Sequence, residues 1–565
     1  MPNAKLILDY VFEHESGQGD RVYLTQPLVG GEVVDYTWAE VLDQSRRMAS
    51  YLQGRGLGRG DQVAILSKNC AHFFMAELAI WMAGATTVAI YPTELADTVH
   101  FVLEHSEAKL LFVGKLDNWE QQVDGVPAGV PIVTFPLAPP TRHTRWDDAV
   151  AGHAPMPGHP ARAPRDLALI AYTSGSTGEP KGVMHSFEGI TRAAESIVAR
   201  GKEIDCADPR GRQASPQRFL SYLPLAHVVE RAWVECASLV RGDTQVFFAE
   251  SMNTFQADLQ RARPTFFHSV PRLWLLFQQG VFAKIAPRTF DRLLRIPFLG
   301  RLVAHKILVG MGLDQTSAAG SGAAPLPPEL IAWYRRLGLN LMEAYGMTED
   351  FGCSHCSSLA KNQPGYVGPP CPGVEVRIGP DHEVQVRSPG RLVGYFKRPD
   401  LDAECFTEDG FFHTGDMGEL NPDGLLKITG RVKELFKTSK GKYVAPAPIE
   451  TLLNAHPLIE SALVSGVGQR AAYGMVVLAQ HVRARLQDPV VRDEVDRALG
   501  ALLLEVNAQL AAHEQLQMLV VAEQPWSIEN GCLTPTLKIR RARIEATTAA
   551  RVAQWYANPA PVVWS

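Results

Sequence analysis

The stretch YTSGSTGEPKG, residues 172–182, follows the apolar run 167–172 and precedes a helical apolar pattern over 190–198. Glycines let the backbone turn its N–H groups inward, and hydroxyls add further donors that a phosphate accepts. Lys181 adds a positive charge at the end of this loop. The pattern therefore predicts a polyphosphate-binding loop between a strand and a helix. Its candidate ligands are Thr173, Ser174, Gly175, Ser176, Thr177, Gly178 and Lys181.

This loop differs from the Walker type, in which a Gly-Lys pair is followed at once by Ser or Thr. Here Pro180 precedes Lys181 and Gly182 follows it, so no hydroxyl stands next to the lysine to hold Mg²⁺. A solvated Gly/Ser turn is the alternative interpretation. The density of hydroxyls beside a lysine favours ATP binding, by chemistry other than that of a P-loop ATPase.

Outward from the loop, short apolar strands alternate with helical segments, which is typical of parallel sheets with right-handed crossovers. The predicted fold class is α/β: a large N-terminal domain (1–431) of two doubly wound αβ subdomains and a small β-rich part (about 366–430), then a small mobile α+β domain (432–565). Residues 127–164 are predicted to be a looser connection. The strand candidates are 63–66, 87–91, 110–113, 167–172, 219–223, 244–248, 265–269 and 340–343, and helices are expected at 72–82 and 95–104.

The bulk composition is that of an ordinary soluble globular protein of 565 residues, with 46% hydrophobic and 20% charged residues. A net charge of −5 predicts no attraction to nucleic acid. The opening residues 1–20 make a poor signal peptide, and no apolar run is long enough to span a bilayer. Eight scattered cysteines predict reduced thiols and a cytoplasmic location.

One cysteine cluster is a candidate metal site, but it lacks a second well-spaced pair. Lining of a loop or pocket is the favoured interpretation of this cluster, which comprises Cys353, His355, Cys356 and, further on, Cys371.

Six more segments follow in a fixed order: SYLPLAHVVER (221–231), GSGAAPLPPEL (320–330), EAYGMTED (343–350), FHTGDMG (412–418), ITGRVKELFKTSKGKYVAPAPIE (428–450) and LTPTLKIRR (533–541). With YTSGSTGEPKG they resemble the adenylate-forming acyl-CoA synthetase superfamily, and most closely its long-chain fatty acyl-CoA synthetases. The resemblance implies that a carboxylate attacks the α-phosphorus of ATP to give an acyl-adenylate and pyrophosphate. Coenzyme A then displaces AMP to leave a thioester.

The first step crowds anions together, so cations and N–H donors must offset their repulsion. By resemblance, residues 173–178 and Lys181 hold the β- and γ-phosphates, while Glu349 and Thr177 coordinate Mg²⁺, an ion that prefers hard oxygen ligands. An exposed loop acid is the alternative interpretation of Glu349.

The resemblance also implies contacts to the nucleotide. Tyr345 offers a flat face to adenine, and Asp416 with Arg431 holds the ribose, although Asp416 could equally cap a turn. The remaining implied nucleotide contacts, some of them shared with the acyl head group, are Gly322, Ala323, Ala324, Glu343, Ala344, Gly346, Met347, Thr348 and Ile428.

Two basic residues of the C-terminal part have implied roles in the two steps. Lys538 bridges the α-phosphate and the carboxylate during adenylation, although Leu537 stands where the wider superfamily has glycine. Lys433 marks the hinge about which the C-terminal domain rotates. Lys437 then approaches the adenylate, and Lys440 with Gly441 approaches coenzyme A.

His227 in LPLAH matches the family's residue near the acyl carboxylate, which implies positioning or gating of the substrate. A structural hydrogen bond is the alternative. General-base catalysis is unnecessary, because a carboxylate is already ionised at neutral pH.

Residues 284–306 interleave basic and bulky apolar side chains, with Asp291 as the only acid. Such a segment could settle peripherally on an anionic bilayer at the inner face of the membrane. The favoured interpretation is a pair of helices packed on the core with a solvated basic rim, because Pro287 and Pro297 break the helix.

Two other functions compete with a fatty acyl-CoA ligase. One is an adenylating ligase that passes its acyl group to a carrier protein. The other is a nucleotide-binding regulator without catalysis, which the joint presence of Lys181, Glu349, Asp416, Arg431 and Lys538 disfavours.

Overall fold

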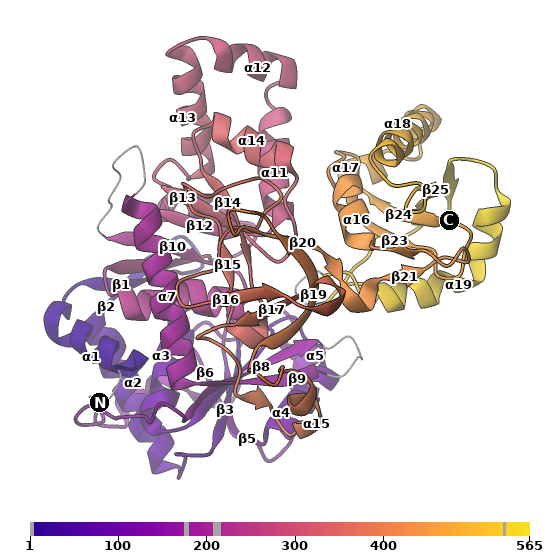
Figure 1. Cartoon of the computed structure of the whole chain (residues 1–565). Helices are drawn as coiled ribbons and strands as arrows, with labels where there is room; N and C mark the ends of the chain where they lie inside the picture. Colours follow the sequence, from indigo (N-terminus) through magenta and orange to yellow (C-terminus); the bar gives the residue numbers. More distant parts are fainter. Residues whose placement is uncertain (1–4, 175–179, 207–215, 535–537) are drawn as a thin grey trace. The chain divides into compact units, whose positions relative to one another are not determined.

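The computed structural model describes residues 5–174, 180–206, 216–534 and 538–565, which form two compact units (Figure 1). Unit 1 comprises residues 1–324, 328–376 and 386–412, and unit 2 comprises 325–327, 377–385 and 413–565. The predicted α/β class, with a large N-terminal and a smaller C-terminal part, is confirmed. The predicted functional boundary at 431/432 lies within unit 2 and stays a prediction.

The largest sheet of unit 1 contains residues 172–174 and 180–182, the described ends of the predicted phosphate-binding loop. Its strands from β8 to β7 are parallel, whereas β9 and β18 are antiparallel to their neighbours. Its spatial order is β18 (Gly394–Tyr395), β9 (Pro180–Ser186), β8 (Leu167–Ser174), β4 (Thr86–Ile90), β3 (Gln62–Leu66), β5 (Ala108–Val113), β6 (Ile132–Thr134) and β7 (Thr144–Arg145).

Two details of this sheet differ from the sequence prediction. Lys181 lies on strand β9, and the helix that follows, α7 (Phe187–Cys206), begins only after it. The region 127–164 is not merely a loose connection, because β6 and β7 extend the sheet and α6 (Trp146–Ala151) packs beside them. Trp146, fully buried in the core, anchors this region.

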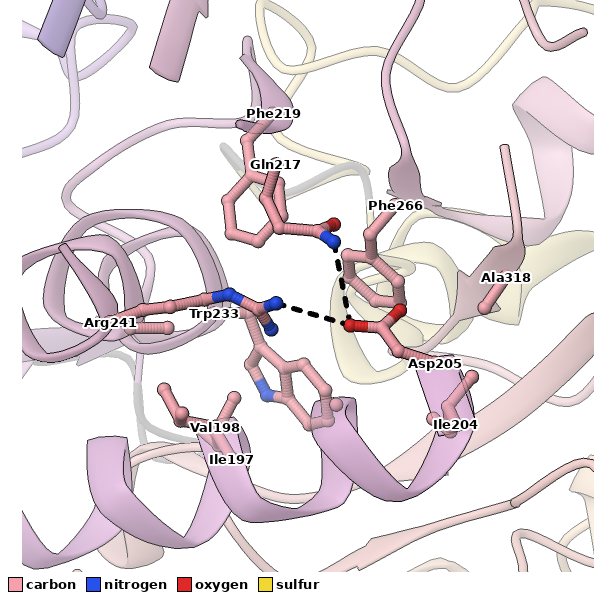
Figure 2. Close-up of a pocket in the computed structure, with 12 residues that line it drawn as sticks. Ile197, Val198, Ile204, Asp205, Gln217, Phe219, Trp233, Arg241, Phe266 and Ala318 are labelled. Carbon is pink, nitrogen blue, oxygen red and sulfur yellow. Dashed lines mark hydrogen bonds and ion pairs between the residues drawn. The ribbon is translucent and has the colours of Figure 1, made fainter. Parts of the chain in front are cut away.

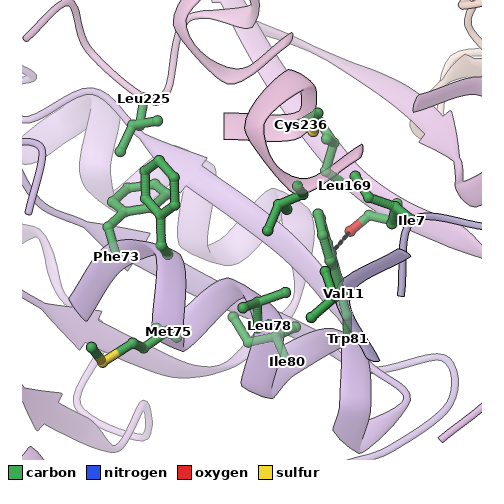
Figure 3. Packing of buried hydrophobic residues seen from close by; sticks show 14 of the residues in the cluster. Ile7, Val11, Phe73, Met75, Leu78, Ile80, Trp81, Leu169, Leu225 and Cys236 are labelled. Carbon is green, nitrogen blue, oxygen red and sulfur yellow. Dashed lines mark hydrogen bonds between the residues drawn. The ribbon is translucent and has the colours of Figure 1, made fainter. Parts of the chain in front are cut away.

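Helix α3 (Ala71–Ala83) is buried at every position, as expected of a helix that is apolar on all sides. Its side chains Phe73, Leu78 and Trp81 pack among residues from distant segments of the chain (Figure 3). The indole of Trp81 donates to the carbonyl of Ala168 on β8 at 3.0 Å, which ties the helix to the sheet. Helix α2 (Trp38–Gly54), which contacts α3, begins with a reciprocal Thr37–Glu40 capping box.

Unit 1 has two further four-stranded sheets among the described residues. Strand β1 pairs in parallel with β11, although it comes from near the start of the chain. One sheet has the order β10 (Gln217–Ser221), β11 (Thr244–Phe248), β1 (Val22–Pro27), β2 (Val33–Thr37), and the other has the order β12 (Phe266–Ser269), β13 (Ala318–Ser321), β14 (Leu341–Tyr345), β15 (His355–Cys356).

Three helices follow β12: α11 (Pro271–Phe282), α12 (Pro287–Arg295) and α13 (Leu299–Met311). Pro287 begins α12 and Pro297 lies between α12 and α13, so the predicted breaks are confirmed. Figure 1 shows α12 at the outer end of this helical group. Across the described residues, no helix combines the length and the apolar character needed to cross a bilayer.

The predicted β-rich region forms a sheet in the order β16 (Glu375–Ile378), β17 (Glu383–Arg387), β19 (Phe412–Leu420), β20 (Leu426–Arg431). A hairpin of β21 (Phe436–Lys437) and β22 (Tyr443–Val444) follows. The last sheet of unit 2 is β23 (Ile459–Ser465), β24 (Ala472–Leu478), β25 (Leu516–Val521) and β26 (Val562–Trp564), and the principal helices of unit 2 are α16 (Pro446–Asn454), α18 (Pro489–Ala508) and α19 (Arg541–Ala557).

A buried ion pair joins α3 to the segment that follows β10. The guanidinium of Arg231 contacts the carboxylate of Glu77, with side chains only 2% and 1% exposed, and donates to the carbonyl of Leu225 at 3.0 Å. Glu235 also lies beside Glu77, and its pKa is raised by burial and by that neighbouring charge.

We expect Arg231→Leu to lower the free energy of unfolding by about 3–5 kcal/mol, because it leaves Glu77 charged and unpaired in the core. The double variant Arg231→Leu/Glu77→Leu should recover most of this loss, since apolar side chains often replace a buried pair without cost. Urea unfolding of both variants measures the difference. Equal destabilisation in both would contradict the pairing argument.

Candidate active site

The loop that carries Glu349 is held in place by two residues of the segment 386–412. It begins after β14 and includes the short 3₁₀ turn η3 (Thr348–Asp350). The amide of Leu392 donates to the carbonyl of Glu349 at 2.7 Å, and the hydroxyl of Tyr395 donates to its carboxylate at 2.9 Å. Glu349 is therefore half-buried and oriented, unlike an exposed loop acid.

Lys181 lies near the same tyrosine. Its ammonium group is 5.9 Å from the centre of the Tyr395 ring, within the range of a cation–π contact. Across the β8–β9 pairing, Thr173 is opposite Lys181 and Ser174 is opposite Pro180. The predicted ligands Gly175, Ser176, Thr177 and Gly178 lie outside the described residues.

Tyr395 thus joins the predicted phosphate lysine to the predicted metal ligand, although sequence reasoning did not select it. Burial and the charge of Glu349 raise the pKa of its hydroxyl, so it stays protonated and donates to Glu349. Its segment, LVGYFKRPD, carries no pattern that would single out a tyrosine. Only the pairing of β18 with β9 places it there.

The turn between Tyr345 and Gly352 is compact because of one glycine. A side chain on Gly346 would approach the backbone of Gly352 to 2.9 Å, closer than a Cβ atom is normally found. The amide of Gly352 closes the turn on the carbonyl of Met347 at 2.9 Å. Asp350 accepts from the amide of Met347 at 2.9 Å, and burial raises its pKa to about 8, so it is largely protonated at neutral pH.

His185 on β9 contacts the turn that carries Glu349. Its Nε2 lies 2.9 Å from the carbonyl oxygen of Thr348, the distance of a donated hydrogen bond. Burial lowers the pKa of His185 to about 4, which keeps the ring neutral. His185 comes four residues after Lys181, so one strand positions both the lysine and the Glu349 turn.

The small residues predicted near the adenine or acyl head follow β13. Gly322 donates to the carbonyl of Ser269 at 3.2 Å, and Ala323 adopts a positive φ of 69°. Glu343 is buried, and its carboxylate accepts from the amide of Gly365 at 3.1 Å. Its side chain therefore holds a neighbouring loop.

Among the remaining residues predicted on this turn, Ala344 and Tyr345 pair with β15 opposite Cys356 and His355. The Tyr345 and His355 rings lie 6.1 Å apart. Cys353, Cys356 and Cys371 are buried, and burial raises the pKa of Cys356 to about 12. Within the described ranges, no group of three or more His, Cys, Asp or Glu side chains could hold a metal ion.

His227 begins helix α8 (Val228–Glu230), and its Nδ1 accepts from the amide of Val229 at 3.2 Å. This bond places the ring proton on Nε2 in the neutral histidine. The predicted structural hydrogen bond is therefore present.

The residues after His227 form a buried polar cluster. Glu230 accepts from the amide of Tyr222 at 3.0 Å and lies 3.1 Å from His268 on β12. A π-helix, η2 (Arg231–Cys236), follows directly. Such wide turns are frequent at functional sites.

In unit 2, the predicted ribose ligands are cross-strand neighbours on β19 and β20. Asp416 is paired in register with Arg431, and its carboxylate lies 2.9 Å from the Arg431 guanidinium. Ile428 is opposite Gly418 in the same pairing. Asp416 is buried, whereas the side chain of Arg431 is 59% exposed.

Glu383, which sequence reasoning missed, supports the turn before Asp416. Its carboxylate accepts from the amide of Gly415 at 3.0 Å and lies 2.7 Å from Nδ1 of His413. The three predicted lysines of the next segment, Lys433, Lys437 and Lys440, are exposed. Gly441 adopts a φ of 77° at the tip of the β21–β22 hairpin, a conformation that favours glycine.

Lys538 is exposed. Its amide donates to the hydroxyl of Thr534 at 3.0 Å, and its carbonyl accepts from the Thr534 amide at 2.8 Å. Arg541, three residues later, donates to Glu450 and to the carbonyl of Val464, both at 2.7 Å. Glu450 ends the APAPIE segment and was not selected from the sequence, because its partner lies 91 residues away.

Comparison with known proteins identifies the class to which this arrangement belongs. The AMP-binding enzyme family matches residues 11–395, and the AMP-binding enzyme C-terminal domain matches residues 434–560. The chain belongs to the AMP-binding enzyme family, and the predicted resemblance to adenylate-forming enzymes is confirmed.

Among its relatives, the chain is 31% identical to long-chain-fatty-acid–CoA ligase FadD15 of Mycobacterium bovis, over 97% of this chain and 96% of that protein. It is 29% identical to long chain acyl-CoA synthetase 2 of Arabidopsis thaliana, over 94% and 88%. A solved adenylation domain of a carboxylate reductase from Mycobacterium chelonae is 25% identical with a TM-score of 0.78, covering 99% of this chain and 92% of that one.

We expect the free energy of unfolding to fall as the pH drops from 6.5 toward 4. Burial lowers the pKa of His72 and His185 to about 4 and that of His355 to about 3. The unfolded chain binds more protons at these three histidines in this window. Asp350 acts in the opposite direction as a single group, so the stability present above pH 6.5 is still lost on acidification. Each of the first two groups contributes on the order of 3 kcal/mol.

Urea unfolding across this pH range measures the slope. His185→Gln should make it shallower, whereas His143→Gln, at an exposed position, should leave it unchanged. An unchanged slope in His185→Gln would disprove the assignment.

Proposed function

We propose that the protein is an ATP-dependent long-chain fatty acid–CoA ligase. A fatty acid carboxylate attacks the α-phosphorus of ATP and releases pyrophosphate, and the thiol of coenzyme A then displaces AMP from the acyl-adenylate to form acyl-CoA. The observation that carries this proposal is the Lys181–Tyr395–Glu349 group, held within one unit of a chain that belongs to the AMP-binding family. The relatives named above as long-chain ligases support the choice of substrate.

In this proposal, the loop 173–178 and Lys181 hold the β- and γ-phosphates, and Glu349 with Thr177 holds Mg²⁺. The half-buried carboxylate of Glu349 suits a hard cation, and its hydrogen bond from Tyr395 fixes its orientation. When bound, the ion neutralises phosphate charge. Lys181 steadies the pyrophosphate as it leaves.

The nucleotide contacts are proposed for two groups of residues. Tyr345 faces adenine, while Asp416 and Arg431 hold the ribose hydroxyls. The backbone around these residues supplies the remaining contacts, at Gly322, Ala323, Ala324, Glu343, Ala344, Gly346, Met347, Thr348 and Ile428.

Residues 432–565 are proposed to act as a mobile domain that turns about Lys433. Lys538 serves the adenylation step, and the hairpin with Lys437, Lys440 and Gly441 serves thioester formation. The ion pair between Arg541 and Glu450 supports a positioned Lys538, because it ties Arg541, three residues after that lysine, to helix α16. His227 is proposed to position the acyl carboxylate.

Measurement of pyrophosphate release with carboxylates of graded length, with and without coenzyme A, tests this function against its competitors. The proposed ligase releases pyrophosphate and forms acyl-CoA. Pyrophosphate release without a thioester would indicate a ligase that uses a carrier protein. No release with any acid would indicate a nucleotide-binding regulator.

We expect Lys538→Ala to slow adenylation by about 10²–10³-fold, because one preorganised charge contact to the reacting oxygens is lost. Thioester formation from supplied acyl-AMP should be spared. Single-turnover assays of the two half-reactions measure this separation, with the exposed Lys109→Ala as the matched control. Equal loss in both half-reactions would disprove the two-conformation interpretation.

We also propose that residues 284–306 contact the inner face of an anionic membrane from the cytoplasmic side. Phe290 is buried and anchors α12, but an apolar tip of Ile296, Phe298, Leu299 and Leu302 is 40–79% exposed. Asp291, the only acid, is paired with Arg336 at 2.8 Å. Apolar side chains beside exposed cations match such a surface, and the cations are Lys284, Arg288, Arg292, Arg295, Arg301 and Lys306.

We expect the enzyme to float with liposomes that contain anionic lipid and to be released by high salt. Phe298→Ser/Leu302→Ser should reduce flotation strongly, because it removes apolar area from the tip. Leu504→Ser, which removes an exposed leucine in unit 2, is the matched control. Flotation that is absent in the wild type, or equal in all three proteins, would refute the proposal.

A further inference from the structure

The loop that leads to His227, residues 222–227, lies between β10 and α8 and has no regular secondary structure. Backbone N–H and C=O groups in a buried loop still need hydrogen-bond partners. Within the loop, the amide of His227 donates to the carbonyl of Pro224 at 2.8 Å. Several of the other backbone groups are bound by side chains, so these side chains determine the path of the loop.

Asn69, from the segment between β3 and α3, binds this loop on both sides of Pro224. Its side chain is buried and donates to the carbonyl of Leu223 at 2.7 Å and to the hydroxyl of Ser221 at 2.8 Å. Its oxygen accepts from the amide of Leu225 at 3.2 Å. An asparagine side chain donates and accepts at the same time, so this one residue fixes the backbone before and after the proline.

Glu230 binds the beginning of the same loop from its far end. Its carboxylate is fully buried and accepts from the amide of Tyr222 at 3.0 Å and from Asn69 at 3.2 Å. Its other oxygen lies 3.1 Å from Nε2 of His268, whose carbonyl accepts from the Tyr222 hydroxyl at 3.0 Å. Residues 222–230 therefore form a closed loop, fastened to β12 and to the segment before α3.

The closed loop lies against the turn that carries Glu349. Trp233 of η2, which lines a small cavity beside α7 (Figure 2), donates from its indole to the carbonyl of Gly352 at 2.9 Å. A Cβ atom on Gly352 would lie 3.8 Å from the Cα of Val229, so α8 packs on this end of the turn. His227, which begins α8, is thereby placed relative to the turn of the proposed nucleotide contacts.

Without Asn69, the carbonyl of Leu223 and the amide of Leu225 would lose these partners. A buried backbone group without a partner is unfavourable, so the loop would shift until both groups found new ones. His227 lies two residues after Leu225 and would move with the loop. A displacement of about 1 Å in a group that positions a substrate can reduce the rate by up to about a hundredfold.

We propose that Asn69 and Glu230 are positioning residues that hold His227 where it meets the carboxylate of the fatty acid. The inference rests on the proposed ligase function and on the proposed role of His227 in it. Both residues act through the loop and through His227, without touching the reacting groups.

The test measures kcat and KM for hexadecanoate and for ATP by pyrophosphate release. Asn69→Leu removes every hydrogen bond of the side chain and leaves an apolar residue of similar size. We expect kcat/KM for the acid to fall on the order of tenfold to a hundredfold, because His227 is displaced. The KM for ATP should stay near the wild-type value, because none of the proposed ATP ligands is bound by Asn69.

A double-mutant cycle separates positioning from a general effect on folding. If Asn69 acts through His227, Asn69→Leu should add little to the loss that His227→Ala already causes, because residues that act through one another are not additive. A purely structural role would give losses that multiply. It would also lower kcat through a smaller active fraction and leave the KM for the acid unchanged.

Further variants provide a conservative rescue and a control. Glu230→Gln keeps an oxygen for the Tyr222 amide and should retain most of kcat/KM, whereas Glu230→Leu should behave like Asn69→Leu. Asn69→Asp keeps the shape but loses the donors, and should lower kcat/KM for the acid if Asn69→Leu does not fold. Asn507→Leu is the matched control, because Asn507 binds the amide and the carbonyl of Leu516, both at 2.8 Å, and this variant should keep the wild-type KM for the acid.

Losses that multiply in Asn69→Leu/His227→Ala would overturn the positioning role, as would an unchanged kcat/KM for the acid in the Asn69 and Glu230→Leu variants. Wild-type kinetics in His227→Ala would also overturn it, while the ligase function would stand. If the wild type released no pyrophosphate with any fatty acid, the proposed function would fail, and this inference with it.

Discussion

The need to pair the buried guanidinium of Arg231 constrains much of unit 1. A charge at this depth is tolerated only with a counter-charge and further hydrogen bonds, which Glu77 and the carbonyl of Leu225 supply. Because Glu77 stands on the wholly buried helix α3, the pair fixes the LPLAHVVER segment against the centre of the unit. The same segment carries His227, and its last residue begins the π-helix η2, whose Trp233 lines a small cavity beside α7. The packing of this segment and the position of His227 therefore both depend on pairing the buried charge of Arg231.

The strands with continuous apolar runs were predictable from the sequence, and the antiparallel additions were not. Residues 63–66, 87–90 and 110–113 are buried on both faces, so their composition alone identifies them as strands. Strand β9 escaped prediction because Pro180 and the neighbouring glycine resemble a turn, yet pairing with β8 satisfies its backbone. Strand β1 pairs with β11, which lies more than 200 residues later, and no local sequence pattern predicts such a long-range pairing.

The residues of the candidate site also fall into a group that was predictable from the sequence and a group that was not. Glu349, Lys181, Asp416 and Arg431 were selected from the sequence because each belongs to a short motif. The structure places Asp416 beside Arg431, and it places both Lys181 and Glu349 beside Tyr395. Tyr395, His185, Glu383 and Glu450 were missed because they act through partners from distant segments. Their side chains orient the motif residues, and this role produces no recognisable residue spacing in the sequence. Sequence motifs thus indicate which groups meet a ligand, and tertiary contacts reveal which groups support them.

The Lys181–Tyr395–Glu349 group has a thermodynamic consequence. All three residues belong to unit 1, since the segment 386–412 that carries Tyr395 folds with it. In the proposed mechanism, the arrangement of these three residues does not depend on the orientation of unit 2, so rotation of that unit would not reduce the fraction of molecules able to hold a triphosphate. A ligand held only by these three residues would therefore lose no binding affinity to molecules in which unit 2 has another orientation.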